Sequence, residues 1–162
     1  MFVCLDVDYQ PALVTTGCVG FEAWTDELAA IELVVRSRTA AAAYQPGAFF
    51  ERELPYLLAA LDRMPSPIDA IVIDGYVVLD GGRPGLGAHL HDRRREPVIG
   101  VAKTRFEGAP ALEVTRGDSA KPLYITAIGI DAQHAAEHVR AMHGEFRIPT
   151  LIKRADSLAR GH

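Results

Sequence analysis

Three carboxylates lie on apolar segments of the chain, where burying an unpaired charge would be costly. Asp6 falls within FVCLDVDY, Glu53 within GAFFERELPYLLAAL, and Asp74 ends the run AIVID. Taken singly, each has an ordinary structural explanation, as a strand-edge residue, a solvated helix residue or a turn former. Taken together, they match the need of phosphoryl-transfer enzymes for acidic oxygens that converge on a hard divalent cation. The set therefore indicates a cation site more strongly than any of its members does.

Three further polar residues have both a structural and a chemical interpretation. Asp131, in GIDAQHAAEH, stands where a strand passes into a helix and is equally well explained as an N-cap. Lys103 ends VIGVAK and is either a solvated lysine or a cation that reaches a phosphate. Asp80 lies beside two glycines and is most simply a turn residue.

The cysteines and histidines give little support to a transition-metal site. Cys4 and Cys18 stand in apolar β-rich segments without a CxxC spacing, so we expect two small buried hydrophobic residues. His134 and His138 are spaced for one helix face but lack an HExxH arrangement, which favours a solvent-facing pair. His89, in GLGAHL, could equally pack against a sheet.

Apolar patterning predicts strands and helices in an order typical of a mixed sheet. The first three strands should form an antiparallel meander with short links, whereas the later ones alternate with helices. Pro55 should kink or restart the first helix. The expected strands are 2–9, 15–24, 31–37, 69–80, 97–103, 111–116 and 121–128, and the expected helices are 47–61, 83–95, 131–143 and an amphipathic one within 149–161. The predicted class is α/β, a mixed β-sheet flanked by helices.

Composition sets the remaining limits. A chain of 162 residues, 49% hydrophobic and 23% charged, fits one ordinary globular domain and excludes disordered and fibrous classes. The longest apolar runs fall short of the ~20 residues of a membrane span, and no secretory leader is apparent, so we expect a cytoplasmic protein without membrane contact. The net charge of −4 argues against nucleic-acid binding by bulk electrostatics. A local basic rim remains open, formed by Arg83, Arg93, Arg94, Arg95, Lys103 and Arg105.

Several segments resemble the endonuclease V family, in the same order and over nearly the whole chain. The matching segments are AYQPGAFFERELPYLLAAL, IVIDGY, RPGLGAHL, PVIGVAKTRF, PLYITAIGIDAQHAAEHVRAM and RIPTLIKRADSLAR. The resemblance implies a ribonuclease H-like fold in a single domain over residues 1–162. It also implies hydrolysis of a phosphodiester on the 3′ side of inosine or deoxyinosine, in DNA repair or RNA processing, with Mg²⁺ as cofactor and Mn²⁺ as the alternative.

Carried over by position, the resemblance assigns roles to individual residues. Asp6, Glu53 and Asp74 would be the catalytic metal ligands, and Lys103 would lie near the phosphate. Tyr44 would be an aromatic wedge that stacks on bases while the modified nucleotide leaves the stack. Gly47 and Gly75 would let the backbone approach the displaced base. The remaining predicted contacts to DNA or RNA are Arg83 and His89.

The chain departs from the family pattern at two histidine positions. LDGGRPG replaces a His-Pro-Arg motif, so that Asp80 stands at or near the expected histidine. AIGID replaces a Gly-His pair, and Asp131 is the acid expected to supply the missing ligand. The chain also starts almost at its first strand, so the face that a family helix would cover is available for a homo-oligomer.

These departures keep two other functions open. One is a catalytically weak or inactive relative that binds nucleic acid or a protein partner with the same fold. The other is a ribonuclease H-like enzyme that acts on branched or structured nucleic acid.

Overall fold

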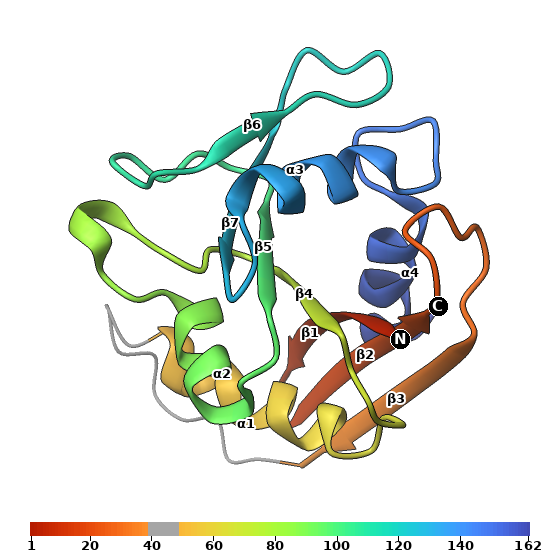
Figure 1. Cartoon of the computed structure of the whole chain (residues 1–162). Helices are drawn as coiled ribbons and strands as arrows, with labels where there is room; N and C mark the ends of the chain where they lie inside the picture. Colours follow the sequence, from red (N-terminus) through yellow and green to blue (C-terminus); the bar gives the residue numbers. More distant parts are fainter. Residues whose placement is uncertain (39–48) are drawn as a thin grey trace.

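A mixed sheet forms the centre of the protein, with strand order β3-β2-β1-β4-β5-β7-β6 (Figure 1). The structure, a computed structural model, describes residues 1–38 and 49–162. The strands within them are β1 (Phe2–Gln10), β2 (Leu13–Phe21), β3 (Ile31–Ser37), β4 (Ala70–Asp74), β5 (Val98–Ala102), β6 (Leu112–Val114) and β7 (Leu123–Ile128). The α-helices are α1 (Phe49–Leu61), α2 (Leu86–Arg94), α3 (Ala132–Ala141) and α4 (Thr150–Ala159).

The direction of each strand follows from its connection. β1, β2 and β3 pair antiparallel, as predicted from their alternating patterns. The link between β1 and β2 is short, residues 11–12, whereas that between β2 and β3 spans residues 22–30. β4 pairs in parallel with both β1 and β5, and its run AIVI is buried on both faces of the sheet, as central parallel strands require. β7 then runs antiparallel to β5. The carboxyl ends of β1, β4 and β5 therefore lie at one edge of the sheet, and that of β7 lies at the other.

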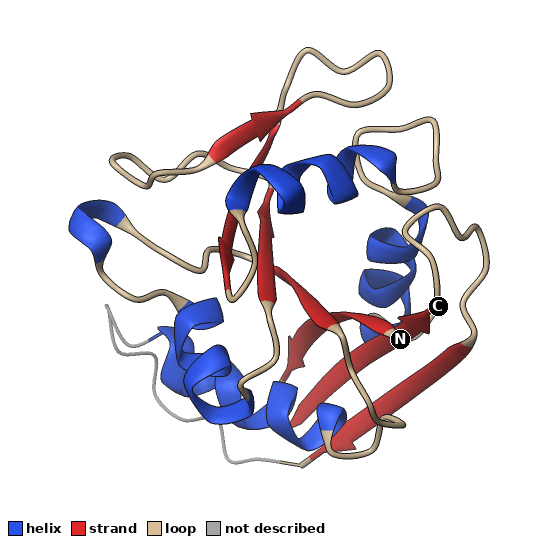
Figure 2. Cartoon of the chain, viewed as in Figure 1, coloured by secondary structure: helices blue, strands red, loops and turns tan. Residues whose placement is uncertain are grey.

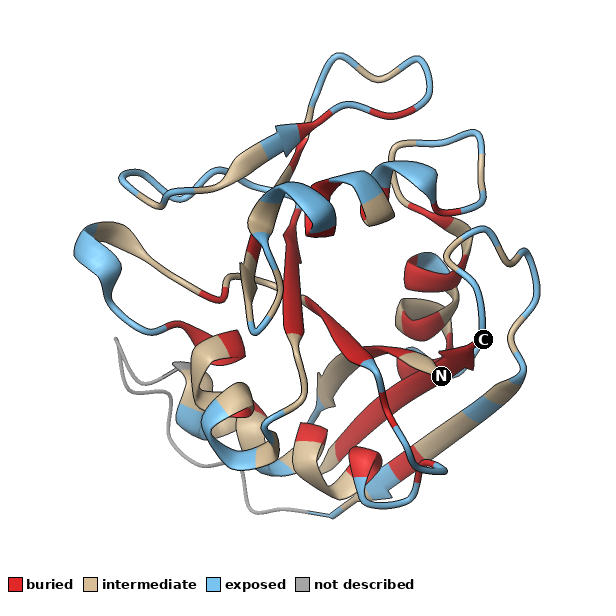
Figure 3. Cartoon of the chain, viewed as in Figure 1, coloured by how far each residue is buried: buried red, intermediate tan, exposed pale blue. Residues whose placement is uncertain are grey.

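Helices cover both faces of the sheet and enclose two cores (Figures 1 and 2). On one face, Leu57 and Leu61 of α1 and Leu90 of α2 pack against β1, β4 and β5. On the other, Val139 of α3 and Leu151 of α4 pack against the same sheet. The central strands are almost wholly buried, whereas the helices bury one side each (Figure 3). This is the α/β architecture that the sequence predicts, and Cys4 and Cys18 are buried in it as free thiols.

One local prediction is wrong, and one of two alternatives at Pro55 is excluded. The strand expected over 69–80 ends at Asp74, because Gly75 adopts a φ of +136° and turns the chain away from the sheet. The next residues lie over β5, where the Val77 amide donates to Thr126 Oγ1 at 2.8 Å. Pro55 does not restart the first helix, which continues through it from Phe49 to Leu61.

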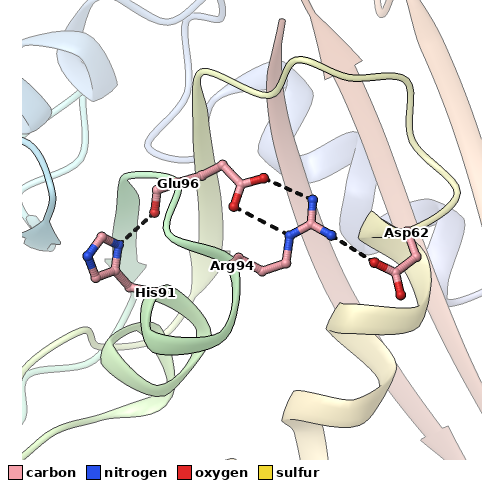
Figure 4. A network of polar contacts seen from close by, with 4 residues as sticks. All are labelled: Asp62, His91, Arg94 and Glu96. Carbon is pink, nitrogen blue, oxygen red and sulfur yellow. Dashed lines mark hydrogen bonds and ion pairs between the residues drawn. The ribbon is translucent and has the colours of Figure 1, made fainter.

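A polar network joins α1 to α2 on their common face (Figure 4). Arg94 at the end of α2 donates to Asp62 Oδ1 at 2.8 Å, and its other nitrogens donate to the Glu96 carboxylate. His91 Nδ1 lies 2.8 Å from the Glu96 carbonyl oxygen. The two helices are thus held together at the end away from the carboxyl edge of β4 and β5.

Within the described ranges, no helix is long and apolar enough to cross a membrane.

Helix α4 lies directly on β2 at Gly17, the residue opposite Asp6 in the β1–β2 ladder. A Cβ at Gly17 would lie 2.2 Å from the Ala155 carbonyl oxygen and 2.7 Å from the Ala159 nitrogen. Both contacts are to helix backbone, which cannot move aside as a side chain can. Glycine at this position therefore sets how closely α4 approaches the sheet.

We predict that Gly17→Ala destabilises the protein by roughly 2 kcal/mol, because overpacking against backbone must displace α4. For a chain of this size, that corresponds to a fall in Tm of roughly 4–8 °C in thermal denaturation. Ser157→Ala, a substitution on α4 itself that adds no atoms, should change stability by less than ~0.5 kcal/mol. Equal melting temperatures for Gly17→Ala and wild type would contradict the packing described.

Candidate active site

The strand register brings Asp6 and Asp74 together. Leu5 pairs with Ile73 in the parallel β1–β4 ladder, so the next residues along each strand are Asp6 and Asp74. Neighbouring strands lie about 5 Å apart. Cys4 and Val72, two residues earlier, both belong to the core beneath α3 and α4, so the two aspartates point to that same face. The pair therefore lies side by side at the carboxyl edge.

Two helices add carboxylates to this pair. Glu53 of α1 is 7% exposed, and burial together with the charges of Asp6 and Asp74 raises its pKa to about 8. Asp156 of α4 lies next to the Asp6 carboxyl, close enough for the two groups to share a proton. Burial, the charge of Asp74 and the shared proton with Asp156 raise the pKa of Asp6 to about 7. Four acids from four elements thus share one region, and their mutual repulsion favours uptake of protons or of a cation.

Cations offset part of this charge. Lys103, immediately after β5, donates from Nζ to Asp74 Oδ2 at 2.7 Å. Burial disfavours the charged lysine, but the hydrogen bond and charge of Asp74, with smaller effects of Asp6 and Asp156, raise its pKa overall. Arg160 Nε donates to Asp156 Oδ1 at 2.7 Å. Burial alone would raise the pKa of Asp156, yet the hydrogen bonds with Arg160 and Asp6 lower it.

The donor set suits Mg²⁺. Hard carboxylate oxygens are the ligands this ion prefers, and one or two of them suffice when waters and substrate phosphates complete its octahedron. In residues 1–38 and 49–162, no three Asp, Glu, His or Cys side chains are grouped closely enough to hold a metal ion by themselves. Asp6 and Asp74, side by side on neighbouring strands, are the residues that would hold the ion, with Glu53 and Asp156 close to them.

The structure separates Asp131 from this group. Its carboxylate caps α3, where Oδ1 accepts hydrogen bonds from the Gln133 and His134 amides at 3.0 and 3.1 Å. Because β7 runs antiparallel to β5, α3 begins at the opposite edge of the sheet. The N-cap explanation of Asp131 is confirmed. The acid that joins the cluster from the end of the chain is Asp156 instead.

An apolar pocket of about 410 Å³ opens beside Asp74 on the face covered by α1 and α2. Phe50, Tyr76, Leu79, Leu86 and Phe106 line it, together with Asp74, Gly75, Arg83, Pro84 and Gly85. A Cβ on Gly75 would meet no atom within 4 Å, so open space lies beside this residue, while its amide donates to the Val101 carbonyl oxygen at 3.2 Å. The Tyr76 hydroxyl donates to the Thr104 carbonyl at 2.7 Å and accepts from the Phe106 amide at 2.8 Å. Tyr76 thereby fixes the turn that follows Lys103.

Of the other predicted nucleic-acid contacts, Arg83 lines this pocket and His89 lies just behind it. Arg83 is already paired with Asp80, with Nε donating at 3.1 Å. His89 stacks on Phe50, a lining residue, with ring centroids 3.7 Å apart. Tyr44 and Gly47 lie outside the described residues.

Comparison with known proteins agrees with this geometry. The family model of endonuclease V matches residues 2–126. Endonuclease V of Streptomyces avermitilis is 40% identical over 139 residues, which cover 72% of this chain and 60% of that protein. The chain belongs to the endonuclease V family. It spans about three fifths of the length of the first relatives it matches, at 60%, 59% and 63%.

Solved structures of this family have the same fold. The crystal structure of endonuclease V from Streptomyces avermitilis superimposes with a TM-score of 0.78 at 30% identity, covering 98% of this chain and 79% of that one. Endonuclease V of Ciona intestinalis, crystallised with DNA containing an inosine, gives 0.84 at 19% identity and covers 98% and 83%. The predicted ribonuclease H-like fold is confirmed.

Three residues at this edge carry roles that sequence reasoning did not assign. Asp156 lies in RIPTLIKRADSLAR, the segment that resembles the end of the family, and this resemblance was the available signal. Tyr76 follows the D-G strand end and was not singled out. Arg147 donates to the carbonyl oxygens of Lys103 and Pro122, and thereby fixes the backbone at Lys103. Hydrogen bonds to backbone carbonyls leave no trace in residue spacing.

We predict that the stability of the metal-free protein falls as the pH rises from about 5 to about 8. The folded-state pKa values of Asp6 and Glu53, about 7 and about 8, lie above their ordinary values. The folded state therefore binds more protons than the unfolded state in this range, and stability is lost as these groups ionise. Thermal denaturation in EDTA should show Tm falling by roughly 5 °C or more.

Asp6→Asn tests the cause of this pH dependence. The amide has the size of the carboxyl but no charge, so the variant should melt above wild type at about pH 8 and show a shallower slope. Asp131→Asn changes an acid at the far edge, and asparagine also caps helices well, so it should keep the wild-type slope. A wild-type Tm that rises over this pH range would refute the mutual repulsion.

Proposed function

We propose that the chain is a metal-dependent endonuclease that hydrolyses a phosphodiester on the 3′ side of inosine or deoxyinosine. The observation that carries the proposal is the convergence of Asp6, Glu53, Asp74 and Asp156, with Lys103, beside an apolar pocket. Like charges at this density cost stability, so the arrangement makes sense where a cation and a phosphate complete it. Membership of the endonuclease V family supports the same reaction.

The residues have separable roles in such a hydrolysis. Water attacks phosphorus, the bond to the 3′ oxygen breaks, and the products are a 3′-hydroxyl and a 5′-phosphate. Bound Mg²⁺ would stabilise negative charge on the leaving oxygen and favour ionisation of the attacking water. Asp6 and Asp74 hold the charge that attracts the ion, and Lys103, which stays charged, neutralises a phosphate oxygen. Glu53 is buried and has a pKa of about 8, close to neutral pH, so its carboxylate is suited to take the proton of the attacking water.

The pocket beside Asp74 suits a base removed from the stack. Its volume of about 410 Å³ provides room for a base, and its rings, Phe50, Tyr76 and Phe106, provide stacking surface. The Ciona endonuclease V structures, crystallised with DNA containing an inosine followed by a ribo-adenosine, support inosine as that base. The proposal covers both DNA and RNA strands as substrates.

We predict that wild type nicks an end-labelled strand containing one inosine in Mg²⁺, and leaves it intact in EDTA. Asp6→Asn and Asp74→Asn should each lower the rate by about a hundredfold or more, because each removes charge that holds the ion. Denaturing gels of DNA and RNA substrates, single-stranded and duplex, measure both effects. Asp131→Asn is the matched control and should cleave at the wild-type rate.

The same experiment distinguishes the other two functions. Inosine-dependent binding without cleavage, unaffected by Mg²⁺, would replace the proposal with a non-catalytic binding module. Faster cleavage of unmodified branched junctions than of inosine strands would assign a different substrate.

Asp156→Asn should also slow cleavage, by about tenfold or more, with the melting temperature close to wild type. The reason is that Asp156 faces Asp6 within the acid cluster, while its partner Arg160 is exposed and pairs with it at the surface. Arg160→Ala is the control, since it removes the same ion pair but keeps the carboxylate. Equal rate losses in the two variants would indicate that only the ion pair matters.

A further inference from the structure

A second hollow, of about 800 Å³, begins at the active site and extends over the face covered by α4. Lys103 and Asp156 form its inner end, and Phe146, Arg147, Ile152 and Lys153 are among its other walls. We call this hollow the α4 groove. The apolar pocket beside Asp74 lies on the opposite face of the sheet, against α1 and α2. The Lys103–Asp74 ion pair, 2.7 Å long, is the point where the two hollows meet.

The chemistry of the α4 groove suits a single nucleic-acid strand. Phe146 is 67% exposed, and a phenyl ring held so far out of the core has a face open for stacking. Lys153 is exposed on the same groove, and Arg147 lies between Phe146 and Lys103. An aromatic platform flanked by cations is the arrangement that binds unpaired strands without sequence preference. Asp118 and Glu145 also line the groove, so the phosphate contacts should fall on the Lys103 and Lys153 sides.

The wall that carries Phe146 is rigidly held. Arg116 is buried and donates to the carbonyl oxygens of Met142, Gly144 and Phe146, the last at 2.9 Å. Arg147 in turn fixes the same wall to Lys103 and Pro122 through their carbonyl oxygens. The exposure of Phe146 is therefore a feature of a fixed loop. Because the loop backbone is already held, stacking on a base costs only the rotamer freedom of the Phe146 side chain.

We infer that the α4 groove binds the nucleotides on the 3′ side of the scissile phosphate, with Phe146 as their stacking platform and Lys153 as a phosphate contact. This inference rests on the proposed function. If the displaced base occupies the pocket beside Asp74 and cleavage takes place on its 3′ side, the strand must cross the acid cluster. It then leaves over Lys103 and Asp156 into the α4 groove, which receives the product that carries the 5′-phosphate.

The test uses fluorescence anisotropy with two single-stranded probes of equal length, each with one inosine and a 5′ dye. One has a long 3′ flank, and the other ends just beyond the scissile bond and has the missing nucleotides added at its 5′ end. Ca²⁺ replaces Mg²⁺, and a gel confirms that the probes stay intact. Phe146→Ala should weaken binding of the long-3′-flank probe by about 5- to 50-fold and of the short one by less than about twofold.

Companion variants separate stacking from charge and from loss of structure. Phe146→Trp should restore the affinity, because the ring face returns. In a plot of the logarithm of the binding constant against the logarithm of the salt concentration, Lys153→Ala should make the slope shallower by about 0.7 to 1. This change should appear with the long-3′-flank probe alone. Leu28→Ala, at an apolar side chain that is 79% exposed elsewhere, and Arg63→Ala, at an exposed cation near α1, should bind as wild type does.

Each outcome decides the inference. Equal losses on both probes, or a larger loss on the probe with the long 5′ flank, would overturn it. If wild type cuts no strand that contains inosine, the proposed function fails, and the α4 groove is then tested with single strands that lack inosine. A loss of affinity for these strands in Phe146→Ala would keep the α4 groove as a strand-binding site. No loss of affinity would overturn the inference as well as the proposed function.

Discussion

Repulsion between carboxylates at the carboxyl edge of the sheet is the constraint around which the rest of the structure is arranged. Asp6 and Asp74 are adjacent because the β1–β4 ladder is in register up to Leu5 and Ile73, and neither strand can shift without breaking that ladder. Glu53 closes the cluster from a buried position on α1. Two well-packed cores, one on each face, supply the stability that holds these charges together. The fold therefore maintains a local excess of negative charge that a cation relieves, and the ion pair of Lys103 with Asp74 offsets only part of it.

The same edge is completed by contacts that act on backbone. Gly17 lets α4 lie against β2, which brings Asp156 to Asp6, so the position of this acid depends on the absence of a methyl group at Gly17. Tyr76 bonds the turn after Lys103, and Arg147 bonds the carbonyl oxygen of Lys103 itself. A lysine on a long flexible side chain is a poor positioning device unless its backbone is fixed. Here Tyr76, on the side of the pocket, and Arg147, on the side of the α4 groove, both fix the backbone at Lys103. The lysine ammonium is thereby placed where the two hollows meet.

The residues that the sequence identified are those whose burial conflicts with their charge. Asp6, Glu53 and Asp74 stand out because apolar neighbours surround them, and the order of strands and helices follows from periodicity and turn residues. Asp156 does not stand out, because an acid on an amphipathic helix has the pattern of a solvated residue until the helix is placed on the sheet. Asp131 could not be assigned from sequence, since the edge at which α3 begins depends on β7 running antiparallel to β5. The strand over 69–80 was predicted too long, because VVL after Gly75 continues the apolar pattern while leaving the sheet.

The pairing of Asp80 with Arg83 bears on what the pocket beside Asp74 can recognise. Arg83 lines the pocket, and Asp80 stands at or near the position where the family motif has a histidine. The acid neutralises the arginine within the loop, so the pocket wall presents rings, aliphatic side chains and backbone in place of an uncompensated cation. A wall of this kind favours a neutral, planar group and gives no advantage to a phosphate. Under the proposed function, the charged part of a nucleotide would then be left to Lys103 and to a cation held by the acid cluster. Recognition of the base and chemistry at the phosphate would in this way be divided between the two sides of a single ion pair.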